Sequence, residues 1–225
     1  MFDLILLLKV LNKNMTSPFK GFKFERNKWY HCPDFDLGDD ECSNGFYATP
    51  IDGLHYAYRP GRRVFVAEVR GQSRIFDCMK QRYEDMMLTD ELTTDQIKQM
   101  ALDAEQRVGY RLSEVLFPIN PLLLPKITPT EADIILLKQW ASVWASVGAS
   151  VRASVWDSVG AYTGGLFPNI TQWKYAEKLG SDPWRPYLTL WYAGYVPSFD
   201  GKTWRLHSGE KAEIVLEWTP KEAAK

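Results

Sequence analysis

The sequence predicts an α+β protein, in which a mixed or antiparallel sheet domain precedes a long repeat helix and a Trp-rich C-terminal segment with a terminal β-hairpin. Three observations favour this class. Several segments of the first half alternate apolar and polar residues with the period of two that strands require. Residues 141–164 repeat a four-residue pattern with Ser and Val at fixed places. The chain holds nine tryptophans, and most of them follow residue 128.

The N-terminus opens with an apolar run from Leu4 to Leu11. This run is too short to span a bilayer, so we expect a short helix or strand docked on the body, or a leader before Met15. The expected divisions of the chain are an N-terminal extension (1–15), a mixed α+β domain (16–127), and the repeat helix with the Trp-rich segment packed on it (128–225).

Strand and helix patterns follow one another in the mixed domain. The clearest strand is RRVFVAEVRG, which alternates around Val64 and Val66. A helix is predicted from a Thr cap near Thr93 to Gly109, because Ile97 and the small apolar residues after it share one face. The remaining elements are expected as strands at 18–24, 27–32 and 82–92, an acidic loop at 34–45, a short helix at 51–58, a turn at 59–61 and a proline-punctuated link at 114–127.

The repeat reads ASVW-ASVG-ASVR-ASVW-DSVG-AYTG from Ala141 to Gly164. Twenty-four residues would span about 36 Å as a helix but about 80 Å as one strand, whereas a chain of this length folds to roughly 45 Å across. We therefore predict a long packed helix from about Thr130 to Tyr162, with Thr128 or Thr130 as its cap. A β-hairpin broken near Gly148 is the alternative.

After the repeat the sequence returns to ordinary globular chemistry. A helix is expected after Pro186, a tight Asp-Gly turn at Asp200, a strand that reaches His207, and a last strand in KAEIVLEW. Asp200 and His207 suggest acid–base chemistry, but the sequence places no nucleophile beside them, so a satisfied turn is the favoured interpretation.

The charge balance and the cysteine content limit the classes of partner and ligand that we expect. Lys and Arg number 27 and Asp and Glu 28, which leaves a net charge of −1 and makes nucleic acid an unlikely partner. The arginine-rich string RPGRRVFVAEVRGQSR is expected to form charge pairs within the chain, to which the nearby acidic segment DFDLGDDE can contribute, and a basic edge that touches nucleic acid is the alternative. Three cysteines are too few for a disulfide framework and favour a cytoplasmic location. His31 and the cysteines lack zinc-ligand spacing, so no metal is expected, and Arg152 and Asp157 argue against a membrane span.

Several segments together resemble an uncharacterised family of phage and bacterial accessory proteins. They are FKGF at 19–22, CSNGFYATPIDGLHYAY at 42–58, RVFVAEVRG, GYRLSEVLFPINPL, the Ser-Val-Trp repeats and VPSFDGKTWRLH. The resemblance covers most of the chain from Pro18 onward. It implies a mobile-element origin, and no activity comes with it.

A weaker resemblance links the first domain to ADP-ribosyltransferases. It implies a split β fold with NAD in its cleft, where Tyr47 would stack on nicotinamide and Glu114 would hydrogen-bond the ribose. A fixed carboxylate there would stabilise the oxocarbenium-like sugar that the departing nicotinamide leaves. The matching positions are Lys20, Tyr47, Thr49, Ala57, Tyr58 and Glu114.

Two functions follow from these patterns. The first is a non-catalytic interaction or assembly module of a phage or mobile element, which binds a protein partner or itself and needs no cofactor. Its partner-binding residues would be Trp144, Arg152 and Trp156 in the repeat, because large aromatics favour interfaces. The alternative is an NAD-dependent ADP-ribosyltransferase that modifies a host macromolecule.

Overall fold

The structure, a computed structural model, describes residues 6–76, 80–147, 154–172 and 182–220. It combines helices with antiparallel sheets, which confirms the α+β class. The chain divides into two compact units, Met1–Phe117 (unit 1) and Pro118–Lys225 (unit 2). This division lies at 117/118, against the expected 127/128, and the strand formed by the N-terminal apolar run belongs to unit 1.

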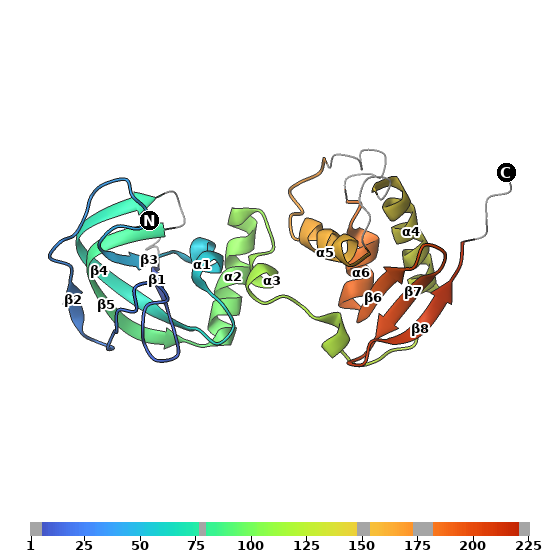
Figure 1. The fold of residues 1–225 in the computed structure, drawn as a ribbon, viewed down its shortest axis with the longest axis horizontal. Helices are drawn as coiled ribbons and strands as arrows, with labels where there is room; N and C mark the ends of the chain where they lie inside the picture. The colour runs from blue at the N-terminus through green and yellow to red at the C-terminus, as the bar shows by residue number, and fades with distance from the viewer. Residues whose placement is uncertain (1–5, 77–79, 148–153, 173–181, 221–225) are drawn as a thin grey trace. The chain divides into compact units, whose positions relative to one another are not determined.

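Unit 1 holds a five-stranded antiparallel sheet and the helices that cover it (Figure 1). The predicted strands around Val64 and at 82–92 are present and form a long hairpin. The predicted strand at 18–24 is absent: residues 18–21 form a turn, and Lys23 forms an isolated β-bridge with Thr16. The elements are β1 (Leu8–Leu11), β2 (Trp29–His31), β3 (Phe46–Ala48), η1 (Ile51–Gly53), α1 (Leu54–Ala57), β4 (Arg63–Phe76), β5 (Lys80–Leu92), α2 (Thr94–Val108) and α3 (Leu112–Leu116).

The sheet of unit 1 closes on itself. Its order is β1-β4-β5-β2, and β3 pairs with β5 beside β2. The residue after β3, Thr49, then pairs with Leu8 of β1 through two backbone hydrogen bonds of 2.8 and 3.0 Å. Strands β1, β4, β5 and β3 therefore form a complete circuit, which leaves β1 without a free edge along this contact.

Alternation along the strands divides the side chains of unit 1 between two cores. Leu11, Phe65 and Met86 lie in one core, which the closed sheet surrounds. Val10 and Val64 face the other way and pack against Ile97 of α2. α2 begins and ends as predicted, since Thr93 and Gln96 form a capping box and Gly109 takes the left-handed conformation.

Unit 2 packs helices on one face of a three-stranded antiparallel sheet, so the expected terminal hairpin is part of a larger sheet (Figure 1). The predicted turn at Asp200 joins two of its strands. The elements are η2 (Pro121–Leu123), α4 (Glu131–Val147), α5 (Ser154–Gly165), α6 (Arg185–Tyr192), β6 (Tyr195–Phe199), β7 (Trp204–Ser208) and β8 (Glu213–Trp218).

The tetrad repeat is helical where the structure describes it, as predicted, but it does not form one continuous rod. It contributes the end of α4 and nearly all of α5, which Figure 1 draws as two helices that run in different directions. Thr130 caps α4 through Asp133. Both helices pack on α6, so Val143 of α4 and Ala161 of α5 enter the same core. A single straight helix could not bring both stretches to α6.

Glycines let α5 approach α6 closely. A Cβ added at Gly165 would lie 2.2 Å from Leu188 Cδ1, and one at Gly164 would lie 2.8 Å from the ring of Trp184. Backbone and side chain therefore touch where any larger residue would collide, as at the small-residue contacts of packed helices.

Candidate functional site

The residues matched to the ADP-ribosyltransferase pattern lie on separate elements of unit 1. Tyr47 is on β3, and its hydroxyl donates to Ser43 O at 2.8 Å. Lys80 Nζ lies 4.6 Å from the centre of the Tyr47 ring, so an ammonium group already covers one face of it. Burial raises the pKa of the Tyr47 hydroxyl, which keeps it protonated as a donor.

Lys20 and Thr49 have local partners. Lys20 lies in an exposed turn and donates to Asn44 Oδ1 at 3.4 Å. The Thr49 side chain is buried, and its hydroxyl donates to Pro50 O at 3.0 Å. Thr49 therefore serves the closure of the sheet through its backbone, while Lys20 ties its turn to the acidic loop.

Glu114 lies on α3, a helix, at the start of the segment for which the sequence predicted a proline-punctuated link. Its carboxylate accepts a bond from Arg111 at 3.1 Å, and its side chain is 16 % exposed. Figure 1 draws β3 and α3 apart, with α1 and α2 between them. The contacts described for Lys20, Tyr47 and Glu114 thus lead to three different neighbours: Asn44, Ser43 and Arg111.

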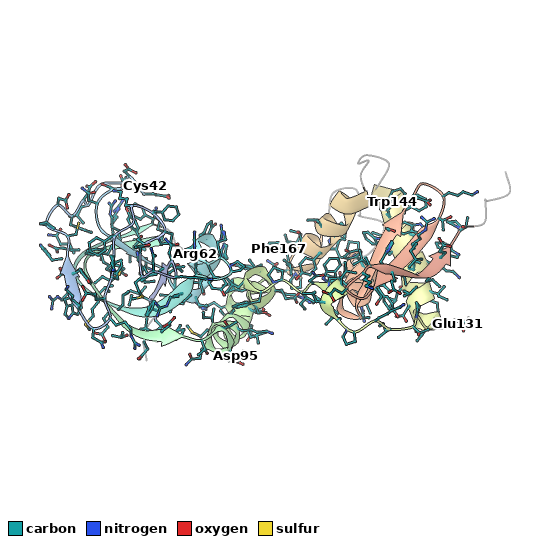
Figure 2. All side chains as sticks on the ribbon, turned by 60° about the horizontal axis from the view of Figure 1, so that its bottom comes forward. Cys42, Arg62, Asp95, Glu131, Trp144 and Phe167 are labelled. Atoms are coloured by element: carbon teal, nitrogen blue, oxygen red, sulfur yellow. The ribbon has the colours of Figure 1, made fainter. Side chains whose placement is uncertain are left out.

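Of the expected partner-binding residues of the repeat, the structure describes the side chain of Trp144 but not those of Arg152 and Trp156. Trp144 lies on α4 (Figure 2), and its ring packs edge-on against Phe199 and Trp204 at centroid distances of 4.9 and 5.7 Å. This places Trp144 at the margin of the unit 2 core. Trp156 is part of α5, but its side chain lies outside the described residues, and Arg152 lies wholly outside them.

The arginine-rich string finds intramolecular partners, as predicted. Arg74 pairs with Asp39 of the acidic loop. Arg63 forms a bidentate pair with Glu91 at 2.6 and 2.7 Å, and other arginines of the string bond to Asp85 and to backbone carbonyls. The arginines of this string therefore bind groups within unit 1 and do not gather into one basic patch.

Where the sequence predicted a strand, the residues Phe19, Lys20, Gly21 and Phe22 form a turn, here called the aromatic tip. Lys20 and Gly21 both have positive φ, 57° and 66°, as in the turns that join tight hairpins. The tip is tied down by a Ser17 N to Phe22 O hydrogen bond of 2.7 Å. Left-handed geometry costs a residue such as lysine about 1–2 kcal/mol, so the surrounding contacts hold the turn against strain.

The two phenylalanines of the aromatic tip have contrasting environments. The Phe22 ring packs edge-on against Phe24, Tyr30 and Phe46 at centroid distances of 4.9 to 5.3 Å. Phe19 is 72 % exposed and Phe22 is 41 % exposed. One ring anchors the turn to the core while the other stands in solvent. The signal for this turn was Gly21, which the alternation of PFKGFKF concealed.

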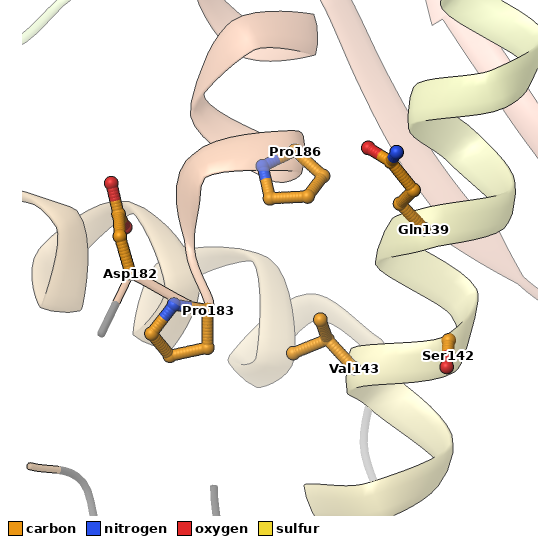
Figure 3. Close-up of a pocket in the computed structure, with 6 residues that line it drawn as sticks. All are labelled: Gln139, Ser142, Val143, Asp182, Pro183 and Pro186. Carbon is orange, nitrogen blue, oxygen red and sulfur yellow. The ribbon is translucent and has the colours of Figure 1, made fainter. Parts of the chain in front are cut away.

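Unit 2 contains a small pocket of about 270 Å³ (Figure 3). One wall comes from α4 and the other from the first turn of α6 and the residues before it. Its volume is below the roughly 300–1,000 Å³ of most ligand sites, so it is too small for a dinucleotide. The lining residues are Gln139, Ser142, Val143, Asp182, Pro183 and Pro186.

Within the described residues, no group of three or more His, Cys, Asp or Glu side chains is arranged to hold a metal ion. Cys32 and Cys42 are free thiols, and Cys42 projects from the acidic loop (Figure 2). Cys78 lies outside the described residues. Among the helices that the structure describes, none combines the length and the apolar character that crossing a membrane requires.

Among the large hydrophobic side chains that the structure describes in unit 1, Phe19 of the aromatic tip is the most exposed. Comparison of the chain with models of known protein families, with curated proteins and with solved structures gives no match.

Proposed function

We propose that the protein is an interaction or assembly module of a phage or other mobile element, and that the aromatic tip of unit 1 binds a partner protein. The exposure of Phe19 is the observation that carries this proposal. A phenylalanine held 72 % exposed at a strained turn has no role in the packing of unit 1 that would select it. Strained backbone of this kind is concentrated at functional sites.

The tip is suited to binding on energetic grounds. Burial of a phenylalanine side chain contributes about 1.5–3 kcal/mol. Because Phe22 and the Ser17 hydrogen bond already fix the turn, a partner pays little to order it. Preorganised aromatic anchors of this type supply much of the affinity at protein interfaces.

The charges around the tip indicate the kind of partner. Lys20 follows Phe19 directly, Lys23 follows Phe22 directly, and both lysines are exposed. A complementary surface would combine an apolar socket for Phe19 with acidic side chains at its rim, since opposite charges steer association and set specificity. We therefore propose an acidic-rimmed apolar pocket on another protein as the binding partner.

Photo-crosslinking tests this proposal. A p-benzoylphenylalanine at position 19 should give a discrete adduct with one other protein in the cell that makes the chain. The matched control carries the same residue at position 56, because Tyr56 is 62 % exposed on a different element, α1. Excess unlabelled wild-type chain should suppress the adduct, and excess Phe19→Ser chain should not.

The outcomes separate the possibilities. Adducts of equal strength at positions 19 and 56, or none at 19, would contradict the proposal. An adduct between two copies of the chain would replace the partner by self-association, which sedimentation velocity of wild type against Phe19→Ser would then measure.

The alternative function, an NAD-dependent ADP-ribosyltransferase, needs Lys20, Tyr47 and Glu114 around one ribose. Lys80 over the Tyr47 ring and Arg111 on Glu114 compete for the faces that NAD would occupy. Thermal unfolding with millimolar NAD decides the matter, because a ligand that binds only the folded state raises the melting temperature. We expect no shift. A rise that Glu114→Ala abolishes would favour the enzyme.

A further inference from the structure

The outer face of the unit 2 sheet carries a serine and a histidine in direct contact. Ser198 Oγ lies 2.8 Å from His207 Nε2. The other ring nitrogen, His207 Nδ1, lies 3.0 Å from the backbone oxygen of Ala212. A carbonyl oxygen only accepts, so Nδ1 carries the proton and Nε2 accepts from the serine hydroxyl. The sequence had suggested that no nucleophile stood beside His207, and the structure corrects this.

Such a chain of contacts is the diagnostic arrangement of an activated nucleophile. The base lies within hydrogen-bond reach of the hydroxyl, and a third group fixes the orientation of the base. In serine hydrolases the third group holds the imidazole in the tautomer that can take the serine proton. Here the carbonyl of Ala212 holds that position.

Two backbone irregularities set this geometry. The pairing of β7 with β8 shifts register between Leu206 and His207, and bulges of this kind re-aim side chains near active sites. Ala212, in the β7–β8 connection, has a positive φ of 50°. Left-handed backbone at an alanine is strained, and at Ala212 it accompanies the carbonyl that meets His207.

The residues around Ser198 supply charge and apolar surface. Arg205 lies directly opposite Ser198 in the β6–β7 ladder, so the two side chains share a face. Arg205 is fixed by Glu217 at 2.7 Å and Asp200 at 2.5 Å, which together raise the pKa of its guanidinium. A guanidinium has five N–H donors, and these two bonds leave others to meet a negative oxygen.

Apolar side chains lie on the His207 side of the pair. Val196 and Ile214 are the cross-strand neighbours of His207 on β6 and β8. Ile214 is 53 % exposed, and Val196 is partly exposed. A carbonyl carbon at Ser198 would thus have a cation on one side and a short apolar strip on the other.

We propose that Ser198 is the nucleophile and His207 the general base of an acyl-transfer site that accepts esters of short aliphatic acids. Ser198 Oγ attacks the ester carbonyl carbon, and its proton passes to His207 Nε2. The C–O bond to the alcohol then breaks, and His207 returns the proton to the leaving alkoxide, which leaves an acyl-serine. Water then hydrolyses the acyl-serine: it attacks the acyl carbon and gives its proton to His207 Nε2. The C–Oγ bond breaks, His207 returns the proton to Ser198 Oγ, and the carboxylic acid departs.

The parts have distinct tasks in this scheme. Arg205 stabilises the negative oxygen of the tetrahedral intermediate, which is where fixed charge contributes most to catalysis. Val196 and Ile214 receive the acyl chain. The face is open rather than enclosed, which favours a small ester or one presented by a larger molecule. The inference concerns unit 2 and does not depend on the binding role proposed for unit 1.

Labelling with a fluorophosphonate tests the nucleophile in the full-length chain. The probe should attach to Ser198, as located by peptide mass spectrometry. His207→Gln should lower the labelling rate by about 100-fold or more, because a positioned general base typically contributes 10²–10⁴. Ser73→Ala, which removes an exposed serine from β4 of unit 1, is the control and should label like wild type.

Turnover of p-nitrophenyl acetate against butyrate tests the rest of the site. Ser198→Ala should abolish the burst of nitrophenol that marks acyl-serine formation. Labelling elsewhere, no labelling at all, or equal rates in wild type and His207→Gln would overturn the proposal. The site of labelling in the wild-type chain tests the proposal by itself. The proposal can therefore be overturned even if a variant fails to fold.

Discussion

The cores of the two units differ in what they bury. The sheet of unit 1 encloses Lys9, and Arg82 is completely buried on its other side, where it donates to the carbonyls of Gly38 and Asp40 at 2.6 and 2.7 Å. The core of unit 2 is built from aromatic rings such as Trp140, Tyr187 and Trp204. Buried cations respond to protonation, and close-packed rings respond to volume. We therefore expect the stability of unit 1 to depend on pH and the stability of unit 2 to depend on the volume of its core side chains.

The buried cations of unit 1 are accommodated by specific partners. Lys9 Nζ donates to Tyr47 O at 2.7 Å and lies 5.4 Å from the centre of the Phe24 ring. Arg82 has room only because Gly45 lacks a side chain, since a Cβ there would lie 2.5 Å from Arg82 Cγ. Without such partners a buried charge would cost several kcal/mol.

The largest effect is expected from a cavity in unit 2. Leu137 of α4 is 0 % exposed in the aromatic core, so Leu137→Ala should destabilise unit 2 by about 4 kcal/mol. Ile135, two residues earlier on the same helix, is 54 % exposed, and Ile135→Ala should change stability by less than about 0.5 kcal/mol. Urea unfolding followed by tryptophan fluorescence measures both. Equal losses would show that α4 does not bury the face assigned to it.

A pH-dependent effect of comparable size is expected in unit 1. Burial lowers the pKa of Lys9 from 10.5 to about 8. Between these two values the unfolded chain binds a proton that the folded chain does not, so stability gains from Lys9 as the pH rises from about 8 to about 10.5. At 1.36 kcal/mol per pKa unit, the gain is about 3 kcal/mol.

The variant Lys9→Met isolates this effect, because it has no charge to bury at any pH. Its stability advantage over wild type should be greatest below pH 8 and shrink towards pH 10.5, as followed by circular dichroism during urea unfolding. Tyr83 and Cys32, whose pKa values burial raises, are present in both chains and cancel in the difference. A difference that stays constant with pH would mean that Lys9 titrates normally.

A smaller effect should separate two glycines of α5. Gly165→Ala places a Cβ against Leu188 and should destabilise unit 2 by about 2 kcal/mol through overpacking. Gly160→Ala meets nothing within 4 Å and should stabilise the helix by up to about 1 kcal/mol. Thermal melts of the two variants should therefore move in opposite directions, and movement in the same direction would argue against the close contact of α5 with α6.

Local chemistry made much of the fold predictable. Thr93 and Gly109 mark the ends of α2, Thr130 caps α4, and the hairpin of β6 and β7 follows from Asp200. Each of these signals acts within a few residues. The break between α4 and α5 was not predicted, because the tetrad pattern has no feature that says how the repeat meets α6.

The contact between Ser198 and His207 depends on the register of β6 with β7 and on the length of the turn between them. The alternation of apolar and polar residues does not specify either. A two-residue turn at Asp200 and Gly201 would pair Phe199 with Lys202, whereas the structure pairs Phe199 with Trp204. This shift brings Ser198 beside His207. The helix at Glu114 was equally hidden, because the prolines after it predict an irregular link, whereas α3 packs against α2 and α1 in the structure.

The pairing of β1 has a consequence for how the protein is made. Leu8 pairs with Val66 and Thr49, and Val64 pairs with Leu92. The earliest of these segments to leave the ribosome must therefore wait for partners that emerge dozens of residues later, and contacts so distant in sequence form slowly. During that interval the apolar side chains of β1, which the folded unit buries, have no core to enter.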